Sequence, residues 1–302
     1  MYKGKYIKAI VFVLLMAGVL QGGIMAYSAV ANQEIKRYAE AAAYTDVHNE
    51  DESDTIAQEV EIPRKEIDIS RIMLKTEVEA QITSLDAANA AKNIENYKTL
   101  LAALDVPQSF QTEIEDMYIR GHKVKDVLIA YEFLYQSYGF IEELEELITQ
   151  KEYGMSWNMI FKEHKNSMET FEPSNFEGGK LEEIFKTPGI TPDDIIIADR
   201  TAQQTGMKFD ELIAMRGQGM SWKIINEELE IVNTSAELPR VAVTSAQVKN
   251  HMKETGLSEE QVIEALVLAQ KLDKDGKAVV DKFKAGKIEE DIIAESLEEK
   301  YQ

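Results

Sequence analysis

The feature that most limits the fold of this chain is an internal repeat. The tetrapeptide Gly-Met-Ser-Trp occurs at 154–157 and again at 219–222, and these copies hold both tryptophans of the chain. Glycines at 121, 189 and 256 are spaced 68 and 67 residues apart, and each is followed nine residues later by an alanine. Self-similarity at a fixed period is the signature of a tandem-repeat protein. The sequence therefore predicts three copies of about 50 residues each, at a period of about 67 residues.

The copies share turn glycines and small or apolar residues. An apolar residue lies four positions before the first glycine, which fits the left-handed position just past a helix end. Thr191 and Ser258 then suit the N-cap of a second helix. That helix is expected to end at Gly139, Gly206 and Gly276, before a short apolar helix. The recurring residues are Gly121, Gly189 and Gly256; Ala130, Ala198 and Ala265; Gly154, Gly219 and Gly286; Trp157 and Trp222; and Ile160, Ile225 and Ile292.

The two tryptophans are interpreted as packing residues. Ser156 and Ser221 stand where an N-cap belongs, and Trp222 and Ile225 follow on one helical face. This register predicts a ring buried in the core of each copy, with its N–H donating to a carbonyl. In the third copy Glu289 takes this place, and we expect a terminal repeat to turn it toward water.

A second interpretation of the aromatic residues is a sugar-binding platform. Trp157 and Trp222 would stack on sugars, together with the aromatic cluster of Tyr131, Tyr135 and Tyr138. This hypothesis requires those rings to be exposed, whereas the helical register favours burial.

The predicted fold is all-α, with three tandem helical repeats and an N-terminal helical cap. The repeats are placed at 113–165, 181–232 and 248–300, and the cap at 63–107, where apolar residues recur with helical spacing. Linkers containing proline and glycine leave open whether the copies stack or form separate bundles. Stacking is expected, because a unit of about 50 residues buries little core alone.

The first residues predict export. Lys3, Lys5 and Lys8 precede an apolar run, and Ala29-Val30-Ala31 provides a cleavage site, so residues 1–31 are expected to be a signal peptide. The alternative is a single uncleaved membrane anchor through residues 9–31. Residues 32–62 are highly acidic and poor in apolar side chains, which predicts a flexible spacer.

The charge balance excludes one class of partner. The chain has a net charge of −21, and removing residues 1–31 leaves 30 basic and 54 acidic residues, a net charge of −24. Binding to a phosphate backbone needs clustered lysine and arginine, so no nucleic-acid partner is expected.

No motif for catalysis, a cofactor or a metal is found. The four histidines make no zinc-ligand spacing, and the chain has no cysteine for a thiolate site or a disulfide. A calcium loop beginning at Asp273 would need a glutamate where Lys284 stands. We therefore nominate no catalytic, cofactor-binding or metal-binding residue, and expect no cofactor.

Two resemblances follow from these motifs. Residues 209–229 resemble the first two helices of Myb-like and sigma-factor helix-turn-helix domains, but the segment that follows has no basic residue and contains Pro239. The likeness covers about 20 residues per copy and implies a helix-turn packing pattern only. The leader and the repeated G-x-S-W-x-x-I-x-x-E pattern resemble exported bacterial helical-repeat proteins of unknown function. That resemblance implies no activity.

The function expected from these observations is a non-enzymatic scaffold or protein-binding module of the cell envelope or extracellular space. Its partner would be a protein or the cell wall, and only residues 9–31, if uncleaved, would contact the membrane. Two alternatives remain, a carbohydrate- or peptidoglycan-binding module and an accessory to a wall hydrolase. A hydrolase itself would need two converging carboxylates, roughly within 10 Å of each other.

Overall fold

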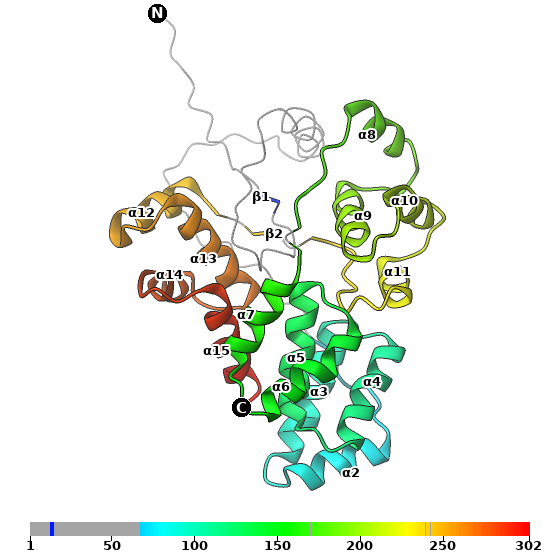
Figure 1. Cartoon of the computed structure of the whole chain (residues 1–302), viewed down its shortest axis with the longest axis vertical. Coiled ribbons are helices and arrows are strands. Elements are labelled where there is room, and N and C mark those ends of the chain that lie inside the picture. The colour runs from blue at the N-terminus through cyan, green and yellow to red at the C-terminus, as the bar shows by residue number, and fades with distance from the viewer. Residues whose placement is uncertain (1–12, 15–66, 170, 239, 242) are drawn as a thin grey trace, which may run out of the picture.

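The computed structural model describes residues 13–14, 67–169, 171–238, 240–241 and 243–302 (Figure 1). These residues form an all-α structure, which confirms the predicted fold class. A two-residue antiparallel ladder joins β1 (Val13–Leu14) to β2 (Arg240–Val241). Apart from 13–14, the predicted leader 1–31 and the spacer 32–62 lie outside the described residues.

Two helices precede the first predicted repeat. They are α2 (Thr76–Leu85) and α3 (Ala90–Ala103). Their apolar faces bury Val78, Ile82 and Tyr97, and they pack against α4 and α5, described next. The ring of Tyr97 meets that of Tyr118 edge-on, with centroids 5.1 Å apart. The pair therefore closes one side of the largest core.

Twelve further helices are described, and they fall into three segments of four. The first segment consists of α4 (Gln108–Ile119), α5 (Val124–Ser137), α6 (Leu144–Glu152) and α7 (Trp157–Ser167), with a 3₁₀ turn η1 (Ile141–Glu143) before α6. The second segment consists of α8 (Gly178–Ile184), α9 (Pro192–Thr205), α10 (Phe209–Gly217) and α11 (Trp222–Glu228). The third segment consists of α12 (Ser245–Thr255), α13 (Glu259–Lys271), α14 (Gly276–Lys284) and α15 (Glu289–Lys300).

Two helix ends differ from expectation. At the end of α5, Tyr138 and not Gly139 takes the left-handed conformation, with φ of 68°. Gly276 was predicted to end the second helix of the third segment, but α13 ends at Lys271, and Asp273 takes the left-handed conformation with φ of 53°. Gly276 is instead the first residue of α14. The reason is that the carboxylate of Asp275 caps α14 by accepting from the Ala278 N–H at 2.8 Å, so the new helix begins directly after it.

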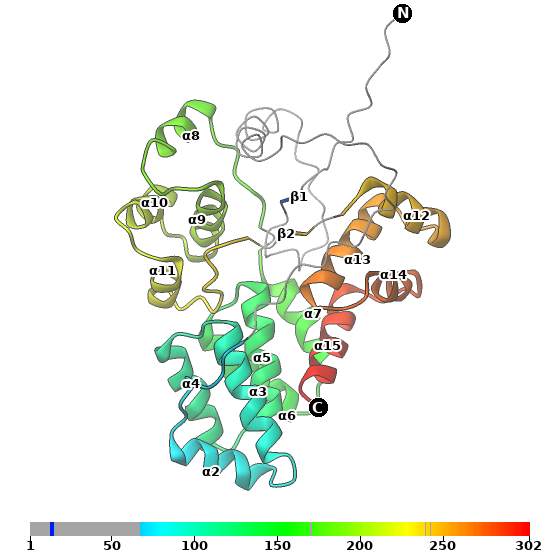
Figure 2. The ribbon, with the colours of Figure 1, turned by 180° about the vertical axis from the view of Figure 1, so that it is seen from behind.

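The segments are not arranged in chain order. The first segment lies in the middle, and the second and third flank it on opposite sides in both views (Figures 1 and 2). The main core joins α2–α7 to α13–α15, whereas α8–α11 have their own core. The expected stacking in a row is therefore not observed. The long connection through 229–244 provides enough chain for the third segment to pass the second and dock on the first.

Candidate functional site

All six recurring turn glycines adopt the left-handed backbone conformation. Their φ angles range from 77° to 98°, a region in which a β-carbon is strained. Each therefore allows the chain to leave one helix and enter the next within a few residues. The six are Gly121, Gly154, Gly189, Gly219, Gly256 and Gly286.

The other recurring residues lie inside the cores. The alanines leave room for close contact between helices, and the isoleucines and tryptophans fill space, so their shared role is packing. None is more than 1% exposed: Ala130, Ala198, Ala265, Ile160, Ile225, Ile292, Trp157 and Trp222.

The indole of Trp222 belongs to a hydrogen-bond centre at Asp194. The Trp222 Nε1–H and the Arg216 Nε–H both donate to Asp194 Oδ1, each at 2.7 Å. The other carboxylate oxygen, Oδ2, accepts from the Thr191 N–H at 2.7 Å and from its hydroxyl at 2.8 Å. Asp194 is the third residue of α9, where it forms a capping box with Thr191. One carboxylate thus connects the beginnings of α9 and α11.

The pKa of Asp194 reflects this environment. Burial by itself raises the pKa, but the hydrogen bonds from Arg216, Thr191 and Trp222 together outweigh burial and lower it. The carboxylate is therefore held in its charged form.

The first segment has the same residue pattern with different contacts. Asp126 follows Gly121 by five residues, as Asp194 follows Gly189, and Lys151 precedes Gly154 by three, as Arg216 precedes Gly219. Yet Asp126 Oδ1 and Trp157 Nε1 are both buried without a hydrogen-bond partner. Burial raises the pKa of Asp126.

Lys151 and its neighbours face the third segment instead. Lys151 Nζ lies 5.4 Å from the centroid of the Trp157 ring and 3.5 Å from Glu298 Oε1 on α15. The Ser156 hydroxyl donates to Asn158 Oδ1 at 2.5 Å, and Asn158 Nδ2 donates to Asp291 Oδ1 at 2.9 Å.

The aromatic rings of the predicted sugar-binding platform are not exposed. Trp157, Trp222, Tyr131 and Tyr138 are between 0% and 4% exposed, and Tyr135 is half-buried. A stacking surface needs open ring faces, and these rings are enclosed by neighbouring helices. These five residues therefore do not provide the exposed rings that the sugar-binding interpretation requires.

The contacts between the first and second segments, here the first–second seam, centre on Arg200. This arginine of α9 donates from Nη2 to the carbonyl oxygen of Ser137, the last residue of α5, at 3.0 Å. Its guanidinium carbon lies 4.4 Å from the centroid of the Tyr138 ring and 5.8 Å from that of Phe171. Burial lowers the pKa of Arg200 to about 10. A cation at the negative end of α5 is favourable, which offsets part of the desolvation.

A polar network lies beside this arginine. The Tyr138 hydroxyl is 2.9 Å from the Thr201 hydroxyl and accepts from Asn226 Nδ2 at 3.1 Å. Asn226 Nδ2 also donates to the Asn233 carbonyl at 2.6 Å. The residues come from the end of α5 (Tyr138 follows its last residue), α9, α11 and the connection to β2, so the network connects four parts of the chain.

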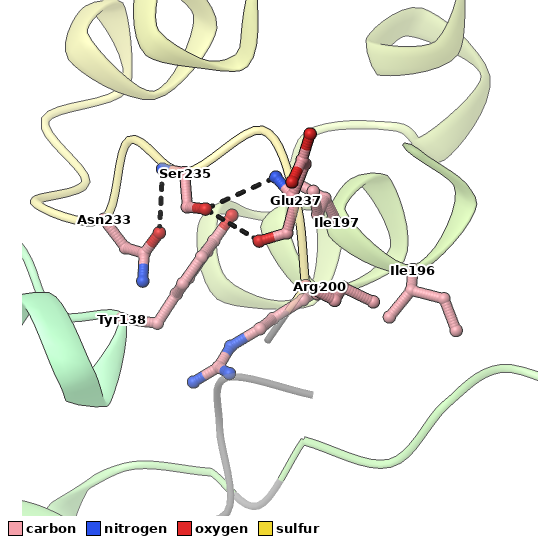
Figure 3. A pocket seen from close by; sticks show the side chains of 8 residues that line it. Tyr138, Ile196, Ile197, Arg200, Asn233, Ser235 and Glu237 are labelled. Atoms are coloured by element: carbon pink, nitrogen blue, oxygen red, sulfur yellow. Dashed lines mark hydrogen bonds between the residues drawn. The ribbon is translucent and has the colours of Figure 1, made fainter. Parts of the chain in front are cut away.

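A small pocket adjoins the same seam (Figure 3). Tyr138, Arg200 and Glu237 are among the residues that line it, and the Glu237 carboxylate points away from the guanidinium group. The space accommodates about one water-sized molecule. It is therefore too small for an organic substrate.

The contacts between the first and third segments, here the first–third seam, pair α7 with α15. Lys165 Nζ contacts Glu290 and lies 3.5 Å from Glu289 Oε2. Glu289 is only 4% exposed, so the expectation that it faces water is wrong. Its side chain is covered because the third segment docks on α7 rather than ending a row of copies.

Three carboxyl groups and two amines meet at this position. Glu264 and Lys271 of α13 act electrostatically on Glu289, together with Lys165 and Glu290. Burial, the largest effect, raises the pKa of Glu289 to about 7 despite the two lysines, and it also raises the pKa of Glu264. Burial lowers the pKa of Lys271, and the charge of Arg200 lowers it further.

The last residues extend the first–third seam to α5. Lys300 Nζ donates to both oxygens of Glu132, at 2.9 and 2.8 Å, and the Tyr301 hydroxyl also donates to Glu132. Tyr301 is 3% exposed. The end of α15 is therefore held on the central segment.

The described residues hold no group of three or more acidic, histidine or cysteine side chains arranged to bind a metal ion. Within the same residues, no helix combines the length and apolar character needed to cross a bilayer.

Several structural residues were missed at the sequence level. Asp126 and Asp194 share one offset from a repeat glycine, so the register could have found them. Arg200 and Lys165 have no such signal, because their partners lie on distant segments.

Comparisons with models of protein families, with curated proteins and with solved structures find no match to this chain.

Proposed function

We propose that this chain is an exported, non-enzymatic helical-repeat protein that acts as a scaffold or protein-binding module of the cell envelope or extracellular space. Its three segments are three copies of one four-helix unit, with α2 and α3 capping the N-terminal side. The repeated turn glycines, each in the same backbone conformation, support the copies. The acid-rich composition suits a partner with a cationic surface.

The observation that carries this proposal is how the buried polar residues are used. Asp194, Arg200, Glu132 and Lys165 contact other parts of the same chain and connect helices or segments. Catalytic groups, in contrast, gather around a pocket that admits substrate. Buried polar side chains that connect segments of one chain are typical of a rigid scaffold.

Export is the first part to test. The full chain would be expressed in a bacterial host and recovered from cytosolic, envelope and medium fractions. We expect it in the envelope or medium with Asn32 as the first residue. Retention in the cytosol with an intact leader would contradict the proposal, whereas an uncleaved chain in the membrane fraction would support the anchor alternative.

Binding is tested with residues 32–302 as bait for crosslinking in envelope and medium fractions, and with purified peptidoglycan. Matched variants change exposed side chains and so preserve the fold: Tyr153→Ser and Met73→Ser, at residues 87% and 85% exposed. We expect one cationic protein to be captured, and capture to be lost with salt. Capture of peptidoglycan alone would favour the carbohydrate-binding alternative, and capture of neither would contradict the binding role.

A further inference from the structure

The first–third seam buries more acid than base. Glu264, Glu289 and Glu290 face two amines, Lys165 and Lys271, where α7, α13 and α15 meet. Glu289 and Glu290 are the first two residues of α15 and are 4% and 3% exposed. Buried charges are stable only when they are paired. With every group ionised, this cluster carries one unpaired negative charge.

The nearby cations do not remove this excess. Lys165 is the one amine within ion-pair distance of Glu289 and Glu290 among the described residues. Arg200 approaches from the first–second seam, but it acts on Lys271 by repulsion, which makes that amine harder to charge. A proton on one carboxyl group is the simplest way to balance the cluster.

The other charged groups of the seam already have partners. Glu132 accepts from Lys300, Glu298 lies against Lys151, and Asp291 accepts from Asn158. Because Asn158 is neutral, Asp291 adds to the excess of negative charge at the start of α15 and does not relieve it.

We propose that docking of the third segment on the first takes up a proton at the Glu264, Glu289 and Glu290 cluster, so that acidification closes the first–third seam and alkaline conditions loosen it. Undocking exposes the three carboxyl groups to water, where each has an ordinary pKa. The docked state binds more protons than the undocked state, and its stability depends on pH for that reason.

The direction of the pH dependence follows from the raised pKa of Glu289. Its ordinary value is 4.5, and burial raises it to about 7 in the docked state. The stabilisation is fully present below the ordinary value and is lost as pH rises through about 7. Burial also raises the pKa of Glu264, which acts in the same direction, whereas burial lowers the pKa of Lys271, which acts in the opposite direction.

Hydrogen exchange on the full chain tests the proposal. Opening equilibria of the α7 and α15 amides are compared at pH 5.5 and 8, after correction for intrinsic exchange, with α9 and α11 as an internal reference. We expect wild-type α15 to open about 30-fold more at pH 8, because a carboxyl group with a pKa of 4.5 when undocked and about 7 when docked changes the docking equilibrium by that factor between the two pH values. An α15 opening equilibrium that does not change with pH would overturn the proposal.

Two variants assign the effect to the cluster. Glu289→Gln mimics the protonated side chain, and we expect it to reduce the pH dependence of α15. Glu298→Gln, at a half-exposed residue of the same seam, is the matched control and keeps the wild-type dependence. Lys165→Met removes a cation and is expected to move the transition to higher pH. An unchanged transition in both Glu289→Gln and Lys165→Met would overturn the assignment.

Discussion

The first and second segments contain the same aspartate, basic residue and tryptophan at the same offsets, yet only one of them joins these residues. In the second segment Asp194 accepts from Trp222 and Arg216, and the unit is locked within itself. In the first segment Trp157 Nε1 has no partner, and Lys151 faces α15. The difference indicates that a peripheral unit uses these residues for its own stability, whereas the central unit uses them to hold a neighbour.

The largest test of this comparison is to neutralise each carboxylate. Asp194→Asn is expected to lower the free energy of local opening of α9 and α11 by about 3 kcal/mol, since it breaks a buried pair. Asp126→Asn is expected to change that of α5 and α7 by less than about 1 kcal/mol, because Asp126 Oδ1 has no partner to lose. Hydrogen exchange measures both, and equal losses would mean that the two centres are equivalent in solution.

Shortening the tryptophans isolates a single hydrogen bond. Trp157→Phe and Trp222→Phe remove similar apolar area, but only the second removes a donor from a charged acceptor. We expect Trp222→Phe to cost about 2 kcal/mol more than Trp157→Phe. The free energies of local opening of α7 and α11 provide the readout, and a larger cost for Trp157→Phe would reverse our interpretation of the two centres.

The turn glycines should show no such difference. Gly154 and Gly219 have φ of 96° and 95°, so Gly154→Ala and Gly219→Ala are each expected to cost about 1 kcal/mol. Gly179→Ala, in a helix with open space at the β-carbon, is the control and should be neutral or slightly stabilising. Urea titration of each variant measures the change, and unequal effects at 154 and 219 would show that the turns differ in solution.

Lowering the pH should also affect the stability of the two centres, at Asp194 and at Asp126, differently. Asp194 has a lowered pKa, so its contribution is present above the ordinary value of 3.8 and is lost as pH falls through the folded value. Asp126 has a raised pKa, so its contribution changes in the opposite direction. The variants Trp157→Phe and Trp222→Phe each keep one fluorescent reporter. We expect the environment of Trp222 to open before that of Trp157 between pH 5 and 3; the reverse order would contradict the assignment.

The sequence allows the all-α class to be predicted because turn glycines and helical spacing are local signals. Trp222 and Ile225 lie on one helical face, and both are fully buried. The predicted starts at 113, 181 and 248 fall inside α4, α8 and α12, since helix beginnings are set by caps that the register alone does not locate.

What the sequence could not provide is the arrangement of the segments. Glu289 looks like a solvent-facing end residue until α7 is known to cover it. Arg200 looks like an ordinary polar residue of α9, and its partner, the Ser137 carbonyl, becomes available only once two segments meet. Repeat spacing describes contacts within a unit, whereas these contacts depend on which units are neighbours.

The placement of the third segment on the first has a consequence for how the chain folds. Leu297 and Tyr301 belong to the same core as Val78 of α2 and Phe133 of α5, so the first and the last of the described helices contribute to one core. Asn158 and Asp291, which join across it, are 133 positions apart. Contacts this distant in sequence form slowly. The core of the central unit is therefore complete only when α15 is docked on it.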